Sequence, residues 1–292
     1  MQKFLAFVFI LSPGFLLAQI PQTQIYLFEI RANGVSSLNL EKPLALTQFN
    51  KAGYNNQPIF FNAYDLYFTL QSDKDTSQTD IYALDLIRQE KRQVTATIDA
   101  EYSPTPMPDG THFSVVRVEP DGSQRLWKLP VDQIGKGMPV FDKITNVGYH
   151  CWLEEDLVAL FLVDEINYLV LAKPSTQKFE RIASGIGRCL NQLPDGRLAF
   201  VQKATDKTWY IKAYDIINQD SEIISKTLPG VEDFTVLEDG TLLMALGSSI
   251  FKKHPALDDN WVSIANLENF SIRNISRLAS WKDQYLAIVA QP

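Results

Sequence analysis

The chain has 292 residues and a formal net charge of −7 at neutral pH. An acidic chain of this kind lacks the basic face with which proteins bind a phosphate backbone, so we expect no nucleic-acid partner. The length exceeds that of many single domains, but propellers and barrels often reach it as one unit.

The chain begins with a segment that is typical of a secretory signal peptide. A positively charged start precedes the unbroken apolar run 4–11, and Ala18 is a small residue suited to cleavage. Pro13–Gly14 interrupts the apolar stretch before it reaches the roughly 20 residues that a membrane anchor needs. We therefore expect residues 1–18 to be a cleaved signal peptide and residues 19–292 to be a mature chain in the periplasm or outside the cell.

No later segment is apolar and long enough to span a membrane, so we expect no transmembrane segment in the mature chain. The most apolar stretch is Leu157–Val163, and acidic residues bracket it on both sides. It is predicted to be a buried strand.

Asp-Gly turns mark an internal repeat. Asp-Gly between two alternating apolar segments is a strong hairpin signal, because the turn requires positive φ. The turns recur at about 43 residues, with one interval doubled, and the same step locates three degenerate copies. The clear turns are Pro108–Gly110, Pro194–Gly196 and Glu238–Gly240, and the degenerate copies fall near Tyr64, Glu154–Asp156 and Asp283.

A second motif, an apolar–aromatic pair at the head of a strand, runs in phase with the turns. Its six copies begin at Ile25, Ile81, Leu126, Tyr168, Trp209 and Ile250. Each unit therefore holds about four strands in 40–50 residues, which is the size of a propeller blade. Helical periodicity is nearly absent.

The two ends of the chain complement each other. The C-terminal segments Phe270–Arg277 and Tyr285–Val289 supply a first and a second strand, and the N-terminal segments Ile25–Ile30 and Pro43–Gln48 supply a third and a fourth. Joined, they complete one blade and remove the exposed edges of an open sheet. We expect an all-β fold: a six-bladed β-propeller of four-stranded antiparallel blades, closed by N- and C-terminal strands that share one blade.

Three segments carry a motif that is known from other proteins: Gln57–Pro58, Ser103–Gly110 and Asp80–Asp85. They resemble the TolB-type, WD-like propeller repeat, and the resemblance covers nearly the whole mature chain. It implies a six-bladed propeller in the bacterial envelope that acts by protein contact. TolB also has an N-terminal domain that takes part in partner binding, for which the residues before the first strand leave no room, so the resemblance does not imply membership in the Tol system.

The two cysteines, Cys151 and Cys189, lie at similar depths on the inner strands of neighbouring predicted blades. Export would permit a disulfide between them. Inner strands diverge with distance from the axis, however, and a bridge needs Cα atoms within about 7 Å. A disulfide and a pair of buried free thiols both stay open.

The sequence holds no recognisable catalytic motif. It has no Gly-x-Ser-x-Gly, no His-Glu-x-x-His and only 3 histidines. The loop Asp73–Asp80 spaces oxygen atoms as a calcium loop does, but Gln78 and Leu84 stand where an EF-hand needs Gly and Glu, which favours a solvated hairpin loop. We expect no cofactor, no metal and no catalytic residue, and enzymatic activity remains an open question with the balance against it.

The candidate site follows from position in the repeat. In a propeller, the segment that leads into each innermost strand lies beside the central channel, and a concave mouth with convergent polar groups favours a binding site. Tyrosine and arginine there suit protein contact. The alternative is that these groups satisfy the backbone and channel waters. The candidate binding residues are Tyr54, Asn56, Glu101, Tyr102, His150, Arg188, Glu232, Asp233 and Arg277.

Two functions are compatible with such a site. The first is an exported, non-enzymatic module that binds a protein or a peptide. The second is a small-molecule hydrolase or lyase with an axial metal ion, held by Glu101, Asn56 and either Glu232 or Asp233. The first is preferred because nothing fixes these carboxylates at a recognisable spacing.

Overall fold

The computed structural model describes residues 20–32, 38–72, 76 and 78–291. The predicted signal peptide, residues 1–18, lies outside the described residues. So do residues 73–75 and 77 of the loop that was considered for calcium. Within the described part, no helix is long and apolar enough to cross a membrane.

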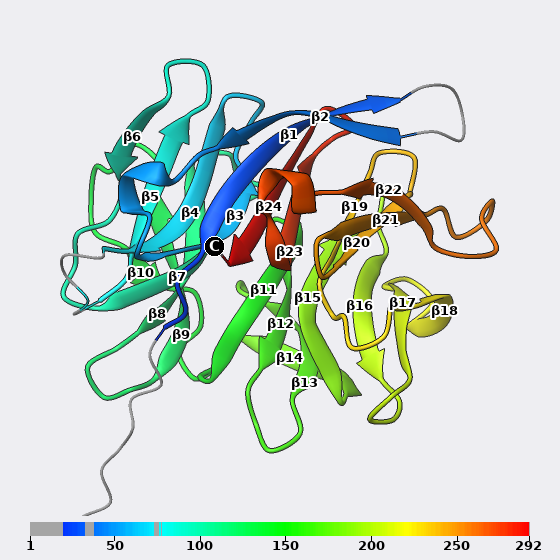
Figure 1. Cartoon of the computed structure of the whole chain (residues 1–292). Coiled ribbons are helices and arrows are strands. Elements are labelled where there is room, and N and C mark those ends of the chain that lie inside the picture. Colours follow the sequence, from blue (N-terminus) through cyan, green and yellow to red (C-terminus); the bar gives the residue numbers. More distant parts are fainter. Residues whose placement is uncertain (1–19, 33–37, 73–75, 77, 292) are drawn as a thin grey trace, which may run out of the picture.

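The described strands form six four-stranded sheets arranged as the blades of a ring (Figure 1). Blade 1 has β3 (Tyr54–Phe60), β4 (Asp65–Gln71), β5 (Asp80–Asp85) and β6 (Glu90–Gln93); blade 2 has β7 (Ala100–Pro106), β8 (His112–Val118), β9 (Gln124–Pro130) and β10 (Met138–Pro139). Blade 3 has β11 (Val147–Glu154), β12 (Leu157–Leu162), β13 (Tyr168–Lys173) and β14 (Lys178–Ser184); blade 4 has β15 (Ile186–Gln192), β16 (Leu198–Lys203), β17 (Trp209–Asp215) and β18 (Asp220–Lys226). Blade 5 has β19 (Phe234–Val236), β20 (Leu242–Leu246), β21 (Ser249–Lys253) and β22 (Val262–Asn266).

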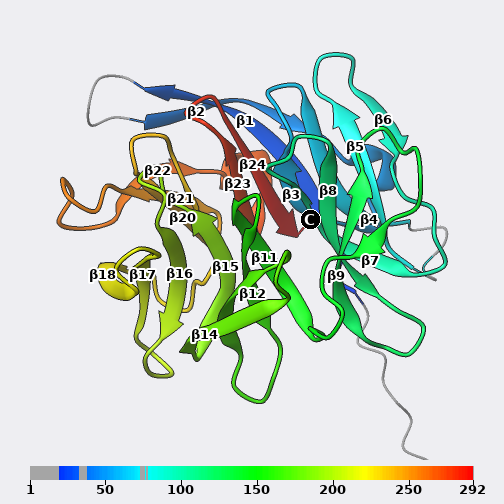
Figure 2. The ribbon, with the colours of Figure 1, turned by 180° about the vertical axis from the view of Figure 1, so that it is seen from behind.

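Blade 6 joins the two ends of the chain, as the sequence predicts. Its order is β2-β1-β24-β23, with β1 (Gln24–Ala32) and β2 (Leu38–Ala45) from the N-terminus and β23 (Arg273–Trp281) and β24 (Tyr285–Gln291) from the C-terminus. Strands β1 and β24 are hydrogen-bonded neighbours and lie side by side in Figures 1 and 2.

Two strands of blade 6 are displaced from their predicted bounds. β23 begins at Arg273 because the preceding Glu268–Phe270 forms a 3-10 turn, η2, which ends at Ser271 with φ 57°. β2 ends at Ala45, because Gln48–Asn50 forms a second 3-10 turn, η1. Short turns of this kind satisfy backbone groups locally, which strand alternation does not reveal.

The Asp-Gly hairpins have a simpler geometry than the sequence suggests. Gly110, Gly196 and Gly240 have φ values of 67°, 87° and 87°, and each donates its N–H to the carbonyl three residues earlier. The preceding aspartates do not have positive φ. These are therefore type I turns with a single left-handed glycine, whereas a type I′ turn would need positive φ at both central residues.

Six hydrophobic clusters hold the ring together, one at each boundary between neighbouring blades. β12, the predicted buried strand, is buried along its whole length. All five tryptophans of the chain belong to these clusters or pack against them. Burial of apolar surface between blades is thus the main force that closes the ring.

Candidate functional site

β-Bulges turn the innermost strands toward the axis. β3, β7, β11, β15 and β23 each show a shift in register against the second strand of their blade. In β3 and β7 the bulge contains a residue at positive φ directly before a proline, Gln57 (φ 54°) and Ser103 (φ 53°). Bulges re-aim side chains, so the Gln-Pro and Ser-Pro pairs that carry the TolB-type resemblance also shape the centre of the ring.

The innermost strands enclose a cavity of about 230 Å³ on the propeller axis, called the axial cavity below. Every blade contributes to its lining. Representative lining residues, from blade 1 to blade 6, are Gln57, Ser103, His150, Arg188, Asp233 and Arg277.

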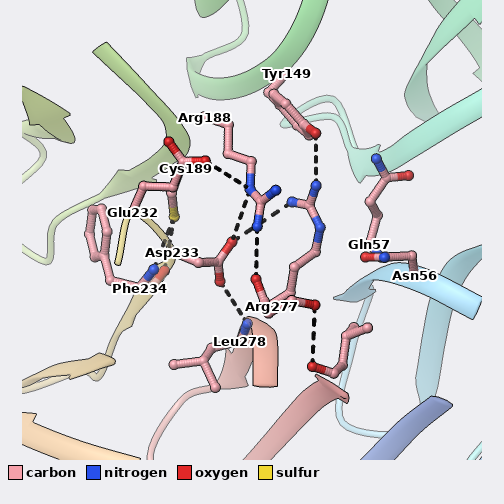
Figure 3. Close-up of polar contacts among 12 residues, drawn as sticks. Asn56, Gln57, Tyr149, Arg188, Cys189, Glu232, Asp233, Phe234, Arg277 and Leu278 are labelled. Carbon is pink, nitrogen blue, oxygen red and sulfur yellow. Dashed lines mark hydrogen bonds and ion pairs between the residues drawn. The ribbon is translucent and has the colours of Figure 1, made fainter. Parts of the chain in front are cut away.

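Five charged residues form a cluster (Figure 3, which labels four of them), and three of them, Arg188, Asp233 and Arg277, line this cavity. Arg188 Nε lies 3.6 Å from Glu232 Oε1 and 4.0 Å from Asp233 Oδ2. Arg277 Nη1 lies 3.8 Å from the same Asp233 oxygen, and Lys203 Nζ lies 2.6 Å from Glu232 Oε2. We call Arg188, Lys203, Glu232, Asp233 and Arg277 the axial charge cluster. Its side chains are 11–33% exposed, so the attractions are screened less than those of surface ion pairs.

Arg277 reaches across the ring. It is in blade 6, and its Nη2 donates to the hydroxyl of Tyr149 in blade 3, on the opposite side of a six-bladed ring, at 2.8 Å. Its guanidinium also lies 4.9 Å from the centre of the Tyr149 ring. Tyr54 also interacts electrostatically with Arg277 and Tyr149, and burial raises the pKa of Tyr54 to about 12. Tyr54 therefore remains neutral near neutral pH.

His150 is buried, with 8% of its surface exposed, and lines the axial cavity. Its Nε2 lies 2.6 Å from Ser114 Oγ, which also accepts a hydrogen bond from Trp152 Nε1 at 2.9 Å. Burial lowers the pKa of His150 to about 3, so the imidazole is neutral. Its Nδ1 has no hydrogen-bond partner in the described structure, and the same is true of Ser103 Oγ and Arg188 Nε.

The remaining predicted residues lie in other surroundings. Glu101 is fully buried and faces the partner strand within blade 2, where it binds Arg117 Nη2 at 2.8 Å. Tyr102 packs against the cluster between blades 2 and 3, and the side chain of Asn56 accepts a bond from the next backbone N–H. None of the three lines the axial cavity.

The structure therefore gathers Arg188, Glu232, Asp233 and Arg277 from the predicted set, with His150 beside them. It adds residues that the prediction left out. Tyr149 directly precedes the predicted His150, Ser103 directly follows the predicted Tyr102, and Gln57 is part of the Gln-Pro motif, so the position in the repeat could have found all three. Lys203 ends β16, a second strand, and the sequence holds no signal that it reaches Glu232.

Both cysteines are free thiols in the structure. Cys189 Sγ donates to the Phe234 carbonyl at 3.0 Å. Burial raises the pKa of both thiols, that of Cys151 to about 12. Such thiols carry little thiolate and are poor nucleophiles at neutral pH.

The carboxylates considered for an axial metal are each held by a cation of the chain. Glu101 pairs with Arg117, Glu232 with Lys203, and Asp233 with Arg277. Within the described residues no three His, Cys, Asp or Glu side chains come together in a group that could hold a metal ion.

Comparison with solved structures identifies the architecture. A protein assigned as TolB from Agrobacterium tumefaciens superposes with a TM-score of 0.67 at 14% identity, over 92% of this chain and 98% of that one. The chain has the fold of a TolB-type propeller. TolB from Acinetobacter baumannii gives a TM-score of 0.60 at 10% identity, and the match covers 91% of this chain and 64% of that one.

The TolB-type fold is shared with enzymes. An oligogalacturonate lyase in complex with manganese matches with a TM-score of 0.58 at 10% identity, over 88% of this chain and 83% of that one. A puromycin-hydrolyzing peptidase from Mycobacterium tuberculosis gives a TM-score of 0.56 at 14% identity, over 82% of this chain and 45% of that one. No protein-family model and no curated protein matches the sequence. The likeness shows the fold, and function has to be argued from the site.

Proposed function

We propose that this protein is an exported, non-enzymatic propeller that binds a peptide or a segment of a protein at its axial cavity. The observation that carries this proposal is the cavity itself, which all six blades line and where charged, aromatic and amide side chains converge. Convergence of polar groups on a concave site favours binding. Arginine and tyrosine, which are enriched at binding hot spots, stand at its centre as Arg188, Arg277 and Tyr149.

Export is part of the proposal and is supported by the N-terminal sequence. Residues 1–18 have the charged start, the apolar run and the small final residue of a signal peptide. The two TolB structures support a binding role through their shared fold, although each is no more than 14% identical to this chain. We place the mature protein in the periplasm or outside the cell.

The metal-dependent enzyme has weaker support. Its proposed ligands Glu101 and Glu232 do not share a site, because Glu101 faces Arg117 inside blade 2. Glu232 and Asp233 are each paired with cationic side chains of the chain, which already balance their charge. Elemental analysis of protein purified without chelator tests this directly, since one tightly bound metal ion per chain would favour the enzyme.

Site-specific photo-crosslinking tests the binding role. A photo-reactive p-benzoylphenylalanine is placed at position 105, where Thr105 lines the axial cavity, or at position 217, where Ile217 is 91% exposed. We expect the full-length protein, irradiated in its producing cells, to form a discrete crosslinked product from position 105 and none from position 217. Products of equal yield from both positions, or from neither, would contradict the proposal.

A further inference from the structure

The two arginines of the axial charge cluster use few of their hydrogen-bond donors. A guanidinium carries five N–H donors in a rigid fork. Among the described residues, Arg277 donates one hydrogen bond, to Tyr149, and Arg188 donates one, to the Ser276 carbonyl at 2.9 Å. The carboxylate oxygens nearest to them lie 3.6 to 4.0 Å away, beyond hydrogen-bond distance. The N–H donors of these guanidinium groups that have no acceptor within hydrogen-bond distance can bind an acceptor atom of a ligand.

The charge balance of the cluster points the same way. Arg188, Lys203 and Arg277 are three cations, and Glu232 and Asp233 are two carboxylates, linked by ion pairs. The cluster therefore carries one excess positive charge in a protein whose overall charge is −7. Burial raises the pKa of Asp233, whereas the neighbouring Arg277 and Arg188 lower it. A single negative charge on a ligand would restore neutrality.

The other walls of the cavity hold unused polar atoms. Ser114 Oγ accepts a hydrogen bond from Trp152 Nε1 and lies 2.6 Å from His150 Nε2 and 3.3 Å from the Thr105 carbonyl oxygen. His150 Nδ1 and Ser103 Oγ have no hydrogen-bond partner among the described residues, and both residues are more than nine-tenths buried. A bound group can thus present an acceptor to the arginines and a second polar atom to His150 or Ser103.

We propose that the axial cavity binds the carboxylate of a peptide, at its C-terminus or on an Asp or Glu side chain, with Arg188 and Arg277 as donors. This inference rests on the proposed function, since it specifies which group of the bound peptide is recognised. A planar carboxylate matches the guanidinium fork and carries one charge, whereas a phosphate carries nearly two. The cavity volume of about 230 Å³ lies below the range of drug-sized pockets, which suits the end or one side chain of a peptide.

Titration with a minimal probe tests the chemistry. N-acetylalanine and N-acetylalanine amide differ only in the carboxylate, and calorimetry or NMR on the mature protein measures each. We expect the acid to bind and the amide not to bind. Arg188→Gln should weaken the acid about ten- to one-hundredfold, the effect of losing hydrogen bonds from a charged group. Equal binding of acid and amide, or unchanged affinity in Arg188→Gln, would overturn the proposal.

Two further variants separate recognition from general effects. Arg88→Gln removes the same charge from a side chain that is 73% exposed, and its affinity should equal that of the wild type. Arg188→Lys keeps the charge and should retain part of the binding. Folding of Arg188→Gln is checked by its thermal melt, and we expect it to fold because Glu232 keeps Lys203 at 2.6 Å.

A peptide array distinguishes this proposal from the proposed function. It presents the same peptides with free or amidated C-termini, and with Asp and Glu or with Asn and Gln. Loss of binding on amidation identifies a terminal carboxylate, and loss with Asn and Gln identifies a side chain; both support the proposal. Arg188-dependent binding of neutral, amidated peptides would leave peptide binding standing and refute carboxylate recognition. Binding of N-acetylalanine without binding of any peptide would refute peptide binding and leave a site for small free acids.

Discussion

Asn55 connects the segment before β1 to the first strand of blade 1. Its side chain is fully buried. Its Nδ2 donates to the Thr23 carbonyl at 2.7 Å and the Asn50 carbonyl at 3.0 Å, and its Oδ1 accepts from Asn50 Nδ2 at 3.1 Å. Asn55→Ala removes these three hydrogen bonds, each worth about 1 kcal/mol, so we expect the free energy of unfolding to fall by about 3 kcal/mol. The lost hydrogen bonds join the N-terminal segment of blade 6 to β3 of blade 1, so the substitution weakens the contact between these two blades.

Urea unfolding followed by tryptophan fluorescence measures this loss. The matched control is Asn260→Ala, an exposed asparagine, which should change the free energy of unfolding by less than about 0.5 kcal/mol. Asn55→Asp should be at least as damaging as Asn55→Ala at pH 8 and should recover at lower pH, because burial raises the pKa of a carboxyl that has no cation beside it. If Asn55→Ala and Asn260→Ala have the same midpoint and slope, the reasoning about this buried network is wrong.

Three further outcomes follow from the burial of single side chains. Leu160→Ala, at a fully buried position of β12, should cost about 2–5 kcal/mol in urea unfolding, whereas Leu257→Ala, at a 69% exposed position, should cost less than about 0.5 kcal/mol. His150 has a pKa of about 3 in the folded protein against 6.5 unfolded, so the unfolded chain binds the extra proton; stability should fall as pH drops from about 6.5 toward 3, by on the order of 1 kcal/mol per pH unit, and His150→Gln should show a shallower fall. Cys151 should react with a thiol reagent at pH 8 about a thousandfold more slowly than a free cysteine, Cys189 should also react slowly, and both should react fully in urea; fast labelling of the native protein would contradict their burial.

The architecture was predictable because the same pattern of turns and strands recurs in every blade, so a weak copy can be located from the clear ones. The glycines at 110, 196 and 240 fix the phase, and the apolar–aromatic pairs confirm it at independent positions. The sequence did not predict turn type or the two 3-10 turns beside blade 6, since these depend on local backbone hydrogen bonds rather than on alternation. The position of a segment in the repeat therefore predicts which strand is innermost, and local backbone hydrogen bonds decide at which residue that strand begins.

The site was only partly predictable for a different reason. Phase placed Arg188 and Arg277 at the axis, and both line the axial cavity. The same phase placed Glu101 there, but Glu101 stands directly opposite Arg117 in the register of β7 and β8, and that cross-strand pair holds it inside blade 2. The ion pair between Lys203 and Glu232 joins neighbouring blades, and the spacing of residues in the sequence does not predict such contacts.

The axial charge cluster also ties blade 6 into the ring at its centre. Arg277 binds Tyr149 of blade 3, Arg188 of blade 4 binds the Ser276 carbonyl, and Asp233 beside blade 5 accepts the Leu278 N–H at 2.8 Å. Blade 6 is assembled from both ends of the chain, and these three contacts anchor its inner strand to blades 3, 4 and 5. A carboxylate bound by both arginines would add a contact shared by blades 4 and 6. Ligand binding and closure of the ring should therefore be coupled, and a carboxylate ligand at free concentration L should stabilise the folded protein by RT ln(1 + L/Kd), so its melting temperature should keep rising with ligand concentration.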